Sequence, residues 1–211
     1  MILLLPRLHK QTICVDNYPR TLPFMNRSAL IILLALAASV ASLSGELRAQ
    51  TFSVSADPDS LGAIPDGAGT GPGNYGPSLD VRFEVVGTQG YVGSIGVEFS
   101  ANHSFVGDLR VRLVAPDGTE HLLFEQTGVS TNIGEGYTSN LVDSAVYSFS
   151  DAASVHWWTA TDFPTDVDIP STTTRTNKPG GIDVPPGLPD FTSMDQAFLG
   201  TPMDGTWILR F

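Results

Sequence analysis

The chain has 211 residues, among them 11 basic and 22 acidic side chains and a single cysteine. This acidic balance argues against binding to nucleic acid or to anionic membrane surfaces, because both partners require basic patches that neutralise phosphate groups. A chain of this length has room for one domain with a full core, and a second domain is not expected.

Residues 25–49 have the plan of a secretory signal peptide. A short start that contains Arg27 is followed by the apolar stretch 29–40 and then by small residues. We expect cleavage between Ala49 and Gln50, with residues 39–41 as a second choice. The twelve positions of the apolar stretch are fewer than the ~20 that a membrane span requires, so export is favoured over an anchor and no stable span is expected after cleavage.

Residues 1–24 show no targeting logic ahead of such a signal, and we expect them to be a non-native N-terminal extension before a start at Met25. The remainder, Gln50 to Phe211, carries 6 basic and 20 acidic side chains, a formal charge of −14, and Cys14 precedes it. This composition predicts a secreted, extracellular or cell-envelope protein without disulfide or thiol chemistry.

The pattern of the remainder changes from irregular to strand-like near residue 79. Residues 50–60 form a polar leader, and residues 62–77 are so rich in Gly and Pro that they predict an irregular arm with turns. Apolar and polar side chains then alternate over residues 79–85, and again over 95–99 after the Gly-rich turn 87–93. Both alternating segments are predicted strands.

A β-hairpin is predicted next. Leu109, Val111 and Leu113 alternate with polar or charged neighbours, which places one apolar row against a core. The sequence Pro-Asp-Gly follows at once, and we expect Gly118 to take the positive φ that only glycine adopts at low cost. The chain then returns through residues 121–124.

Two further strands are predicted at residues 145–149 and 207–211, where apolar residues again alternate. No segment has a sustained helical period, so the predicted fold class is all-β, with Greek-key or jelly-roll connections. Residues 159–190 hold six prolines and a Ser/Thr run at 171–174, which predicts a long surface loop.

Several short sequence words, taken in order, resemble the P/Homo B domain, also called the proprotein convertase P-domain, which follows the catalytic domain in kexin- and subtilisin-like serine proteases. The words are IPDG at 64–67, HSFVGDL at 103–109, PDGT at 116–119, SFSDAA at 148–153, FLG at 198–200 and DGTWIL at 204–209. The resemblance covers residues 61–211 and implies a galactose-binding-like, jelly-roll β-sandwich. It assigns structural roles to Pro65, His103, Gly107, Asp108, Leu109, Pro116, Gly118, Gly205 and Trp207.

The resemblance also implies that a strand is missing. Members of the family continue after the GTWxL word into a further turn and a last strand, whereas this sequence ends at Phe211. We therefore expect an open edge beside the strand 207–211, with part of the core exposed. An earlier segment, such as 52–55, would have to fill that edge if the chain is to be a stable monomer.

No catalytic constellation is recognisable. A subtilisin-type protease requires an aspartate, a histidine base and a serine nucleophile on a strained turn, and the sequence has no Gly-x-Ser-x-Gly word. His103 and Asp108 lie close together in sequence and admit two interpretations, as a base with its orienting group or as loop residues bonded to the backbone. The resemblance supports the second, because the family module performs no bond chemistry.

A calcium site is the cofactor hypothesis that remains. Asp57, Asp59 and Asp66 supply hard oxygen ligands in loops, as Ca²⁺ prefers, and some members of the resembled family hold structural calcium. The same aspartates are also typical of turns and of a soluble surface. Clustered His or Cys is absent, so a transition-metal site is not expected.

The aromatic residues Trp157, Trp158 and Phe163 also admit two interpretations. They mark either an exposed binding face, because aromatic anchors are favoured at interfaces, or core and lid packing. Trp207 alternates within a terminal strand and is expected in the core.

Two functions therefore remain after the sequence is read. The first is a non-catalytic accessory module that docks on a subtilisin-like catalytic domain and stabilises it, in line with the family's association with serine endopeptidases and proteolysis. The second is a free-standing secreted module that binds an extracellular protein or glycan. Fold alone does not separate them.

Overall fold

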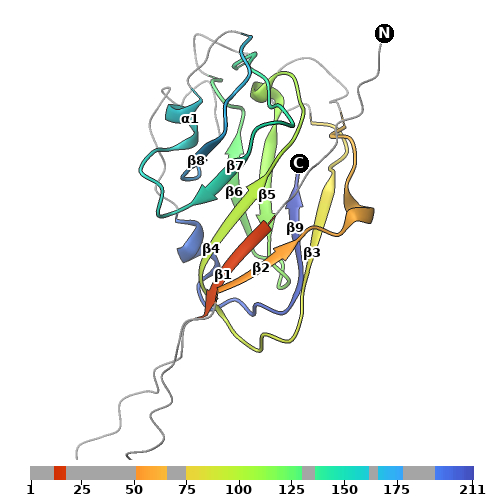
Figure 1. The fold of residues 1–211 in the computed structure, drawn as a ribbon, viewed down its shortest axis with the longest axis vertical. Helices are drawn as coiled ribbons and strands as arrows, with labels where there is room; N and C mark the ends of the chain where they lie inside the picture. The colour runs from red at the N-terminus through yellow and green to blue at the C-terminus, as the bar shows by residue number, and fades with distance from the viewer. Residues whose placement is uncertain (1–11, 18–50, 66–74, 130–135, 162–165, 178–192) are drawn as a thin grey trace, which may run out of the picture.

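The structure is a computed structural model, and it describes residues 12–17, 51–65, 75–129, 136–161, 166–177 and 193–211. Two β-sheets lie face to face with one hydrophobic core between them (Figure 1). The predicted all-β class and the two-sheet sandwich are thereby confirmed at this level, while the jelly-roll connection remains a prediction.

The first sheet has five strands in the order β2-β1-β4-β7-β8. Their bounds are β1 Thr12–Asn17, β2 Thr51–Ser55, β4 Val92–Phe99, β7 Tyr147–Ser150 and β8 Thr172–Thr174. Neighbouring strands are antiparallel except for β7 and β8, which run parallel.

The second sheet has four antiparallel strands in the order β3-β9-β5-β6. Their bounds are β3 Asp80–Val85, β5 Arg110–Val114, β6 Glu120–Glu125 and β9 Gly205–Arg210. The predicted hairpin is formed by β5 and β6, and each alternating segment that the sequence analysis identified between residues 79 and 211 contains a strand.

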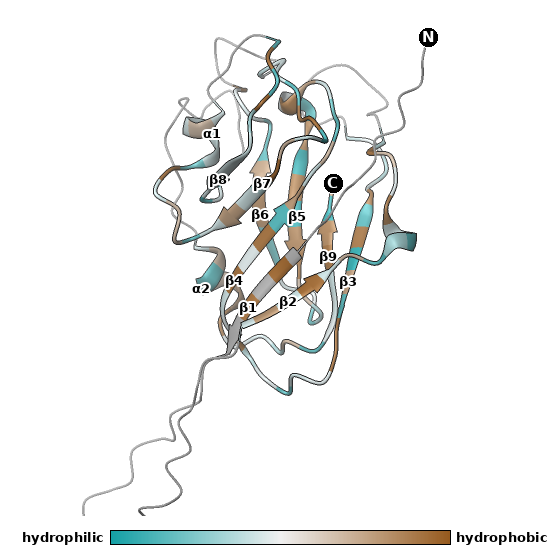
Figure 2. Ribbon diagram, viewed as in Figure 1, coloured by the Kyte–Doolittle hydropathy of each residue, from teal (hydrophilic) through white to brown (hydrophobic). Residues whose placement is uncertain are grey.

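Alternation of apolar and polar residues explains why these segments form a sandwich. Along β3, Val81, Phe83 and Val85 are buried, while Arg82 and Glu84 between them are exposed. Figure 2 shows the same change from hydrophobic to hydrophilic colour along neighbouring strands. Because side chains of a strand point alternately to its two faces, the apolar rows of both sheets meet in the core.

Aromatic rings fill the space between the sheets. Phe124 of β6 stacks on Trp157, with ring centroids 4.4 Å apart, and Phe99 of β4 meets Phe211 edge to face at 5.2 Å. Such offset and edge contacts add to the free energy gained by burial. The C-terminal residue is therefore part of the core.

The described helices are short, as the missing helical period predicts. They are the 3-10 helices η1 Pro58–Ser60 and η2 Val106–Asp108 and the α-helices α1 Trp157–Ala160 and α2 Met194–Phe198. Within the described ranges, no helix is long and apolar enough to cross a bilayer.

The expected open edge beside the last strand is wrong. Strand β9 lies between β3 and β5, and its ladder with β3 continues through two hydrogen bonds between Phe211 and Leu79, of 2.9 and 3.0 Å. The physical reason is that β3, rather than a later strand, supplies the second partner of β9.

The N-terminal boundary also differs from the sequence-based expectation. Residues 12–17 were expected to lie in an extension outside the domain, and residues 50–60 in a polar leader, yet β1 and β2 form one side of the five-stranded sheet. Ile13 and Val15 are 0% and 1% exposed. Their alternation in the sequence is the signal that predicts this strand. The signal peptide over 25–49 lies outside the described residues and stays a prediction.

The proline-rich stretch 159–190 is only partly a surface loop. Its residues 172–174 form β8, which pairs with β7, and Ile169 and Thr174 are fully buried. Strand β8 forms because it pairs in parallel with β7. The sequence does not reveal it, because three residues are too few to show a strand period.

Candidate functional site

Two loops that are distant in sequence lie side by side at one end of the sandwich, shown at the bottom of Figure 1. Residues 86–91 connect β3 to β4, and residues 199–204 connect α2 to β9. The amide of Val92 donates to the carbonyl of Thr201 at 2.9 Å, and the amide of Gly200 donates to that of Val92 at 3.0 Å. A third bond joins Met203 to Gly90 at 2.9 Å.

The carboxylate of Asp204 fixes this arrangement. It accepts hydrogen bonds from the amides of Thr88 at 2.8 Å and Gly87 at 3.1 Å, and from the hydroxyl of Thr88. The Thr88 hydroxyl, followed by the backbone amides, lowers the pKa of Asp204 because these donors favour the charged carboxylate. The loop pair is thus held by a charged group that bonds to several donors at once.

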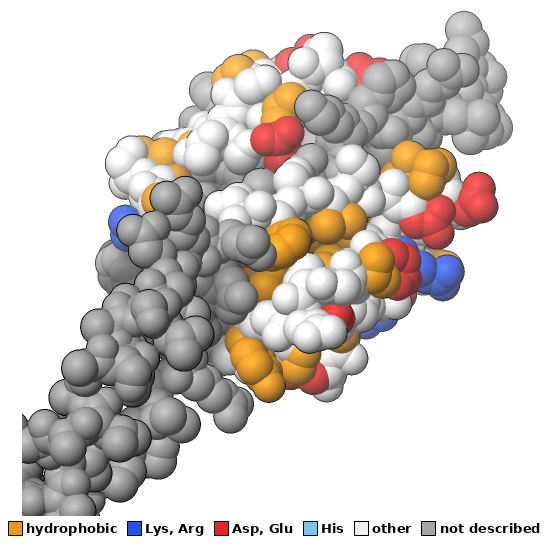
Figure 3. Space-filling view, turned by 60° about the horizontal axis from the view of Figure 1, so that its bottom comes forward, with side chains coloured by type: hydrophobic (Ala, Val, Ile, Leu, Met, Phe, Trp, Pro, Cys, Tyr) orange, Lys and Arg blue, Asp and Glu red, His pale blue; other side chains and the backbone are white. Residues whose placement is uncertain are grey.

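The two most exposed large hydrophobic side chains of the described residues lie on these two loops. Val86 is 81% exposed, Leu199 is 62% exposed and Tyr91 is 37% exposed. Figure 3 turns this end toward the viewer and shows hydrophobic side chains among uncharged and acidic ones. We call residues 86–91 and 199–204 the apolar loop pair. Apolar side chains on a fixed backbone are typical of a protein contact surface.

The P-D-G word of the hairpin lies beside the apolar loop pair. Gly118 has a φ of +86°, as predicted, and its amide donates to the carbonyl of Ala115 at 2.9 Å. The carboxylate of Asp117 accepts from the amide of Thr119 at 2.9 Å. Gly205, at φ +127°, lies so close to Pro116 that a Cβ atom there would come within 2.6 Å of the proline Cβ. The P-D-G and D-G-T-W words are therefore in direct contact.

The H-S-F-V-G-D-L word forms the entry to the hairpin at the other end of the molecule. His103 pairs through its backbone with Leu141, at 3.0 and 2.8 Å, and the amide of Gly107 donates to Tyr137 at 3.0 Å. Asp108 ends η2, and Leu109 is 4% exposed. These contacts place the backbone of the word, and the roles of the His103 and Asp108 side chains stay a prediction.

Two further family-word residues have structural positions. Trp207 is fully buried, and its indole N–H donates to the carbonyl of Met203 at 2.9 Å. Pro65 is half-buried at the end of a described segment, next to Ile64, which packs against the core. The expectation that Trp207 is a core residue is confirmed.

Sequence reasoning missed the role of Asp151, although it lies in the quoted SFSDAA word. Its carboxylate accepts from the amides of Asp195 at 2.8 Å and Met194 at 3.2 Å, and from the hydroxyl of Ser193. It thus binds the first turn of α2, while Asp195 in turn accepts from the amide of Ile95 at 2.7 Å. The Ser-x-x-Gln spacing at 193–196 is the signal for a helix start here.

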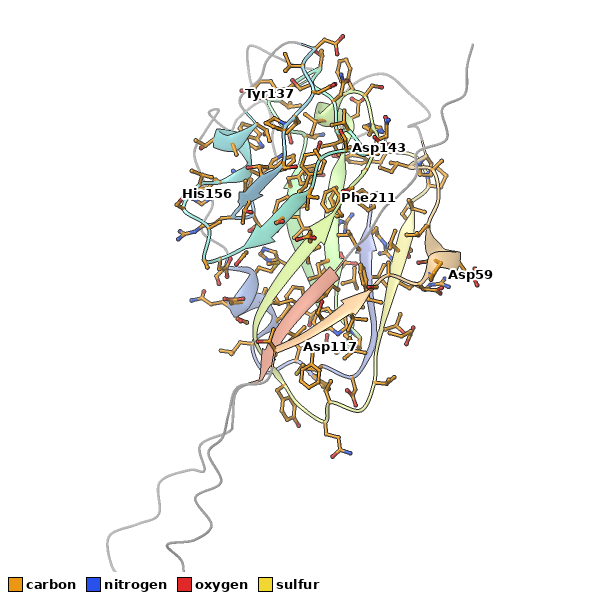
Figure 4. The ribbon with its side chains drawn as sticks, viewed as in Figure 1. Asp59, Asp117, Tyr137, Asp143, His156 and Phe211 are labelled. Carbon is orange, nitrogen blue, oxygen red and sulfur yellow. The ribbon has the colours of Figure 1, made fainter. Side chains whose placement is uncertain are left out.

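The aspartates proposed for calcium are used locally where the structure describes them. Asp57 caps η1, and its Oδ1 atom accepts from the amide of Asp59 at 3.0 Å. Asp66 lies outside the described residues. Within the described ranges no group of three His, Cys, Asp or Glu side chains could hold a metal ion, and Figure 4 shows Asp59, Asp117 and Asp143 in separate regions of the molecule. Calcium binding stays a prediction.

One histidine contacts a hydroxyl group. The Nε2 atom of His121 lies 3.1 Å from Oγ1 of Thr176, but the two residues are only 7% and 4% exposed. Burial lowers the pKa of His121, and the nearby Asp151 acts against this. Because both groups are buried, a substrate has no access to this pair.

The aromatic pair Trp157 and Trp158 belongs to the core, with 0% and 4% exposure. The indole N–H of Trp157 donates to the hydroxyl of Thr127 at 2.9 Å, and the amide of Trp158 donates to the side chain of Asn177 at 2.8 Å. The interpretation of these two residues as an exposed binding face is wrong. Phe163 lies outside the described residues.

Comparison with known families assigns the central part of the chain. Residues 92–158 match the family model described as the proprotein convertase P-domain. The match begins with β4 and includes the HSFVGDL, PDGT and SFSDAA words, so the resemblance inferred from the sequence is confirmed for this segment. No curated protein and no solved structure matches the chain.

Proposed function

We propose, from the P-domain character of residues 92–158, that the chain is a secreted, non-catalytic accessory module of a subtilisin-like serine protease system. It docks on a catalytic domain and stabilises its folded state. The family's association with serine endopeptidases supports the class of partner. The finer statement, that docking uses the apolar loop pair, is supported by the structure of that end of the sandwich.

The exposure of Val86 and Leu199 is the observation that carries the proposal. These are the two most exposed of the large hydrophobic side chains in the described residues. Leaving them in water forgoes the ~1.5–3 kcal/mol that full burial of each such side chain provides. A partner that covers them recovers this free energy without ordering the loops, because the backbone bonds and Asp204 already hold them.

The surroundings of these side chains suit a protein contact. Asp204, Thr88 and Gln89 provide polar groups on the same two loops, and Tyr91 offers a partly exposed aromatic ring. An apolar centre with a polar rim is the common anatomy of specific interfaces. Docking of this kind stabilises the partner by mass action, since the module binds the folded catalytic domain and not its unfolded chain.

The test is the thermal inactivation of a subtilisin-like catalytic domain that lacks a P-domain of its own. We expect its half-life at a fixed temperature to lengthen when the intact chain is added. The double variant Val86→Asp/Leu199→Asp should lose this effect, because each carboxylate would be desolvated at the interface centre. Both positions are exposed, so the variant should still fold.

A matched control uses an exposed valine elsewhere. Val146 is 38% exposed and lies just before β7, remote in sequence from the apolar loop pair. Val146→Asp should stabilise the protease as well as the unaltered chain does. Equal protection by the double variant and the unaltered chain would refute docking through the loop pair, and no protection by any form would refute the proposed function.

A further inference from the structure

Strand β1 occupies a slot between two strands that lie far from it in the sequence (Figure 1). Its residues 12–16 pair with 51–55 of β2 on one side, and residues 12–17 pair with 92–98 of β4 on the other. Both pairings are antiparallel. The occupant contributes Ile13 and Val15 to the core, at 0% and 1% exposure.

The walls of the slot select for apolar side chains at two positions. Ile13 lies opposite Val54 on one side and Val97 on the other. Val15 lies opposite Phe52 and Ile95, by the same registers. Directly opposed residues of neighbouring strands share a face, so each apolar residue of the occupant completes a row across the sheet. A shift by one residue would turn both side chains away from the core.

A backbone bond between the two sheets opposes closure of the slot. Because β2 and β4 are each antiparallel to β1, they run parallel to one another, and in the described part of the sheet β2 has β1 as its ladder partner. The gap between the walls is about two strand spacings of ~4.8 Å. The end of β2 is tied to the other sheet, since the amide of Asp57 donates to the carbonyl of Arg82 at 2.8 Å. That bond opposes the movement that would bring β2 against β4.

A long stretch of sequence separates β1 from β2. Residues 18–50, a stretch of 33, separate it from β2, whereas adjacent antiparallel strands require a turn of only about two residues. Within the described residues, the contacts that retain the occupant are two backbone ladders and the burial of Ile13 and Val15. These contacts are equally available to a strand on a separate chain.

We propose that the slot between β2 and β4 is a strand-binding site for an extended peptide segment whose apolar side chains stand two residues apart. β1 is the occupant within the uncut chain. The proposal rests on the proposed secretion of the protein in one respect. Cleavage before Gln50 would separate β1 from the domain, and a donor strand of a partner polypeptide would then occupy the slot. Recognition then follows the β-augmentation mode, with the backbone supplying affinity and the two apolar positions supplying specificity.

The experiment uses the full chain with a site-specific protease sequence inserted between residues 24 and 25. After folding, the chain is cut, and a fluorescent peptide with the sequence of residues 11–18 is added. We expect native mass spectrometry to show release of the N-terminal fragment and uptake of one labelled peptide per chain. The melting temperature should rise with peptide concentration, because the ligand binds the folded state.

Two control peptides test the mode of binding. One carries Ile13→Asp and Val15→Asp. The other has the composition of the unaltered peptide but places its isoleucine and valine next to each other, so that they point to opposite faces of the strand. Neither should be taken up or raise the melting temperature. As a second variant, the uncut chain with Ile13→Asp and Val15→Asp should take up the unaltered labelled peptide, because its own strand no longer competes.

Three results would overturn the proposal. They are no uptake of the unaltered peptide by the cut chain, equal uptake of a control peptide, and a dimer of the cut chain that excludes the peptide. No subtilisin-like catalytic domain is present in this experiment, so its failure leaves the docking proposal standing. Conversely, a failure to stabilise a catalytic domain leaves strand binding unaffected.

Discussion

At the scale of single residues, Gly118 and Gly205 near the apolar loop pair are required for different structural reasons. Gly118 has a φ of +86°, and a Cβ atom there would meet open space. Gly205 has a φ of +127° and also touches Pro116, so a side chain there would be strained and would collide with the proline ring. The first glycine is required by the turn alone, the second by the turn and by packing.

We therefore predict that Gly205→Ala destabilises the protein more than Gly118→Ala. The cost at Gly118 should be about 1–2 kcal/mol, the penalty of a left-handed backbone with a Cβ atom. Displacement of Pro116 should raise the cost at Gly205 by about 1–3 kcal/mol more, as for other overpacked sites. Denaturant unfolding of both variants measures the difference, and equal midpoints would show that the contact with Pro116 is not constraining.

His121 makes stability depend on pH. Burial lowers its pKa below the ordinary value of 6.5, so the unfolded chain takes up a proton at a higher pH than the folded one. The contribution of neutral His121 to the free energy of unfolding is complete above pH 6.5. It is lost as the pH falls from 6.5 through the pKa of His121 in the folded state. We predict that His121→Gln, which keeps a polar group near Thr176, flattens the fall in unfolding free energy between pH 7 and 5.

One titrating side chain such as His121 changes the free energy of unfolding by at most about 1.4 kcal/mol per pH unit. Lowered carboxylate pKa values at Asp80, bonded to Arg210, and at Asp204 act in a more acidic window, below the ordinary carboxylate value of 3.8. Urea unfolding at a series of pH values separates the two ranges. Identical slopes for the unaltered chain and His121→Gln between pH 7 and 5 would contradict the assignment.

At the scale of elements, Asp151 joins the end of β7 to the first turn of α2. The helix is only five residues long, too short to be stable alone. The position of α2 therefore depends on the three hydrogen bonds that the Asp151 carboxylate accepts and on the hydrogen bond from the amide of Ile95 to Asp195. Because residues 199–204 follow α2 directly, this anchor also places half of the apolar loop pair.

We predict that Asp151→Ala lowers the free energy of unfolding by about 1–3 kcal/mol, since it leaves several donors of the helix start without their acceptor. Asp143→Ala is the matched control, because Asp143 is an exposed aspartate in a turn before β7. Chemical denaturation compares the two variants. A smaller loss for Asp151→Ala than for Asp143→Ala would show that α2 is held by other contacts.

The sequence predicts the elements that carry their own periodicity and misses those that depend on a neighbour. Strands β3, β5 and β9 follow from alternation, and Gly118 follows from turn chemistry. Strand β8 is three residues long and exists through its pairing with β7. The role of Asp151 requires α2 to approach from 42 residues away, which spacing alone does not show.

The N-terminal strand was missed for a different reason. The alternation of Ile13 and Val15 is visible in the sequence. The apolar stretch 29–40 that follows it predicts a signal peptide, however, and residues ahead of a signal peptide are not expected to belong to the domain. Likewise, the apolar loop pair is assembled from two loops that the sequence places more than a hundred residues apart. Only the folded backbone brings Val86 and Leu199 to the same end.

At the scale of the whole molecule, the sandwich supports the surface that we propose for docking. Buried aromatic rings and two sheets fix the loops, and the described histidine–hydroxyl pair is enclosed in protein. The P-domain match over residues 92–158 agrees with a module that works through contact. A measurement that locates contact on the surface of the module therefore tests the proposed docking most directly.

That measurement is amide hydrogen exchange of the full chain, alone and with a saturating amount of a subtilisin-like catalytic domain. We predict slower exchange over residues 86–91 and 199–204 in the mixture, with the strands of the core unchanged because they are already protected. Unchanged exchange throughout, or protection confined to regions outside the apolar loop pair, would contradict the claim that this end of the sandwich docks on the protease.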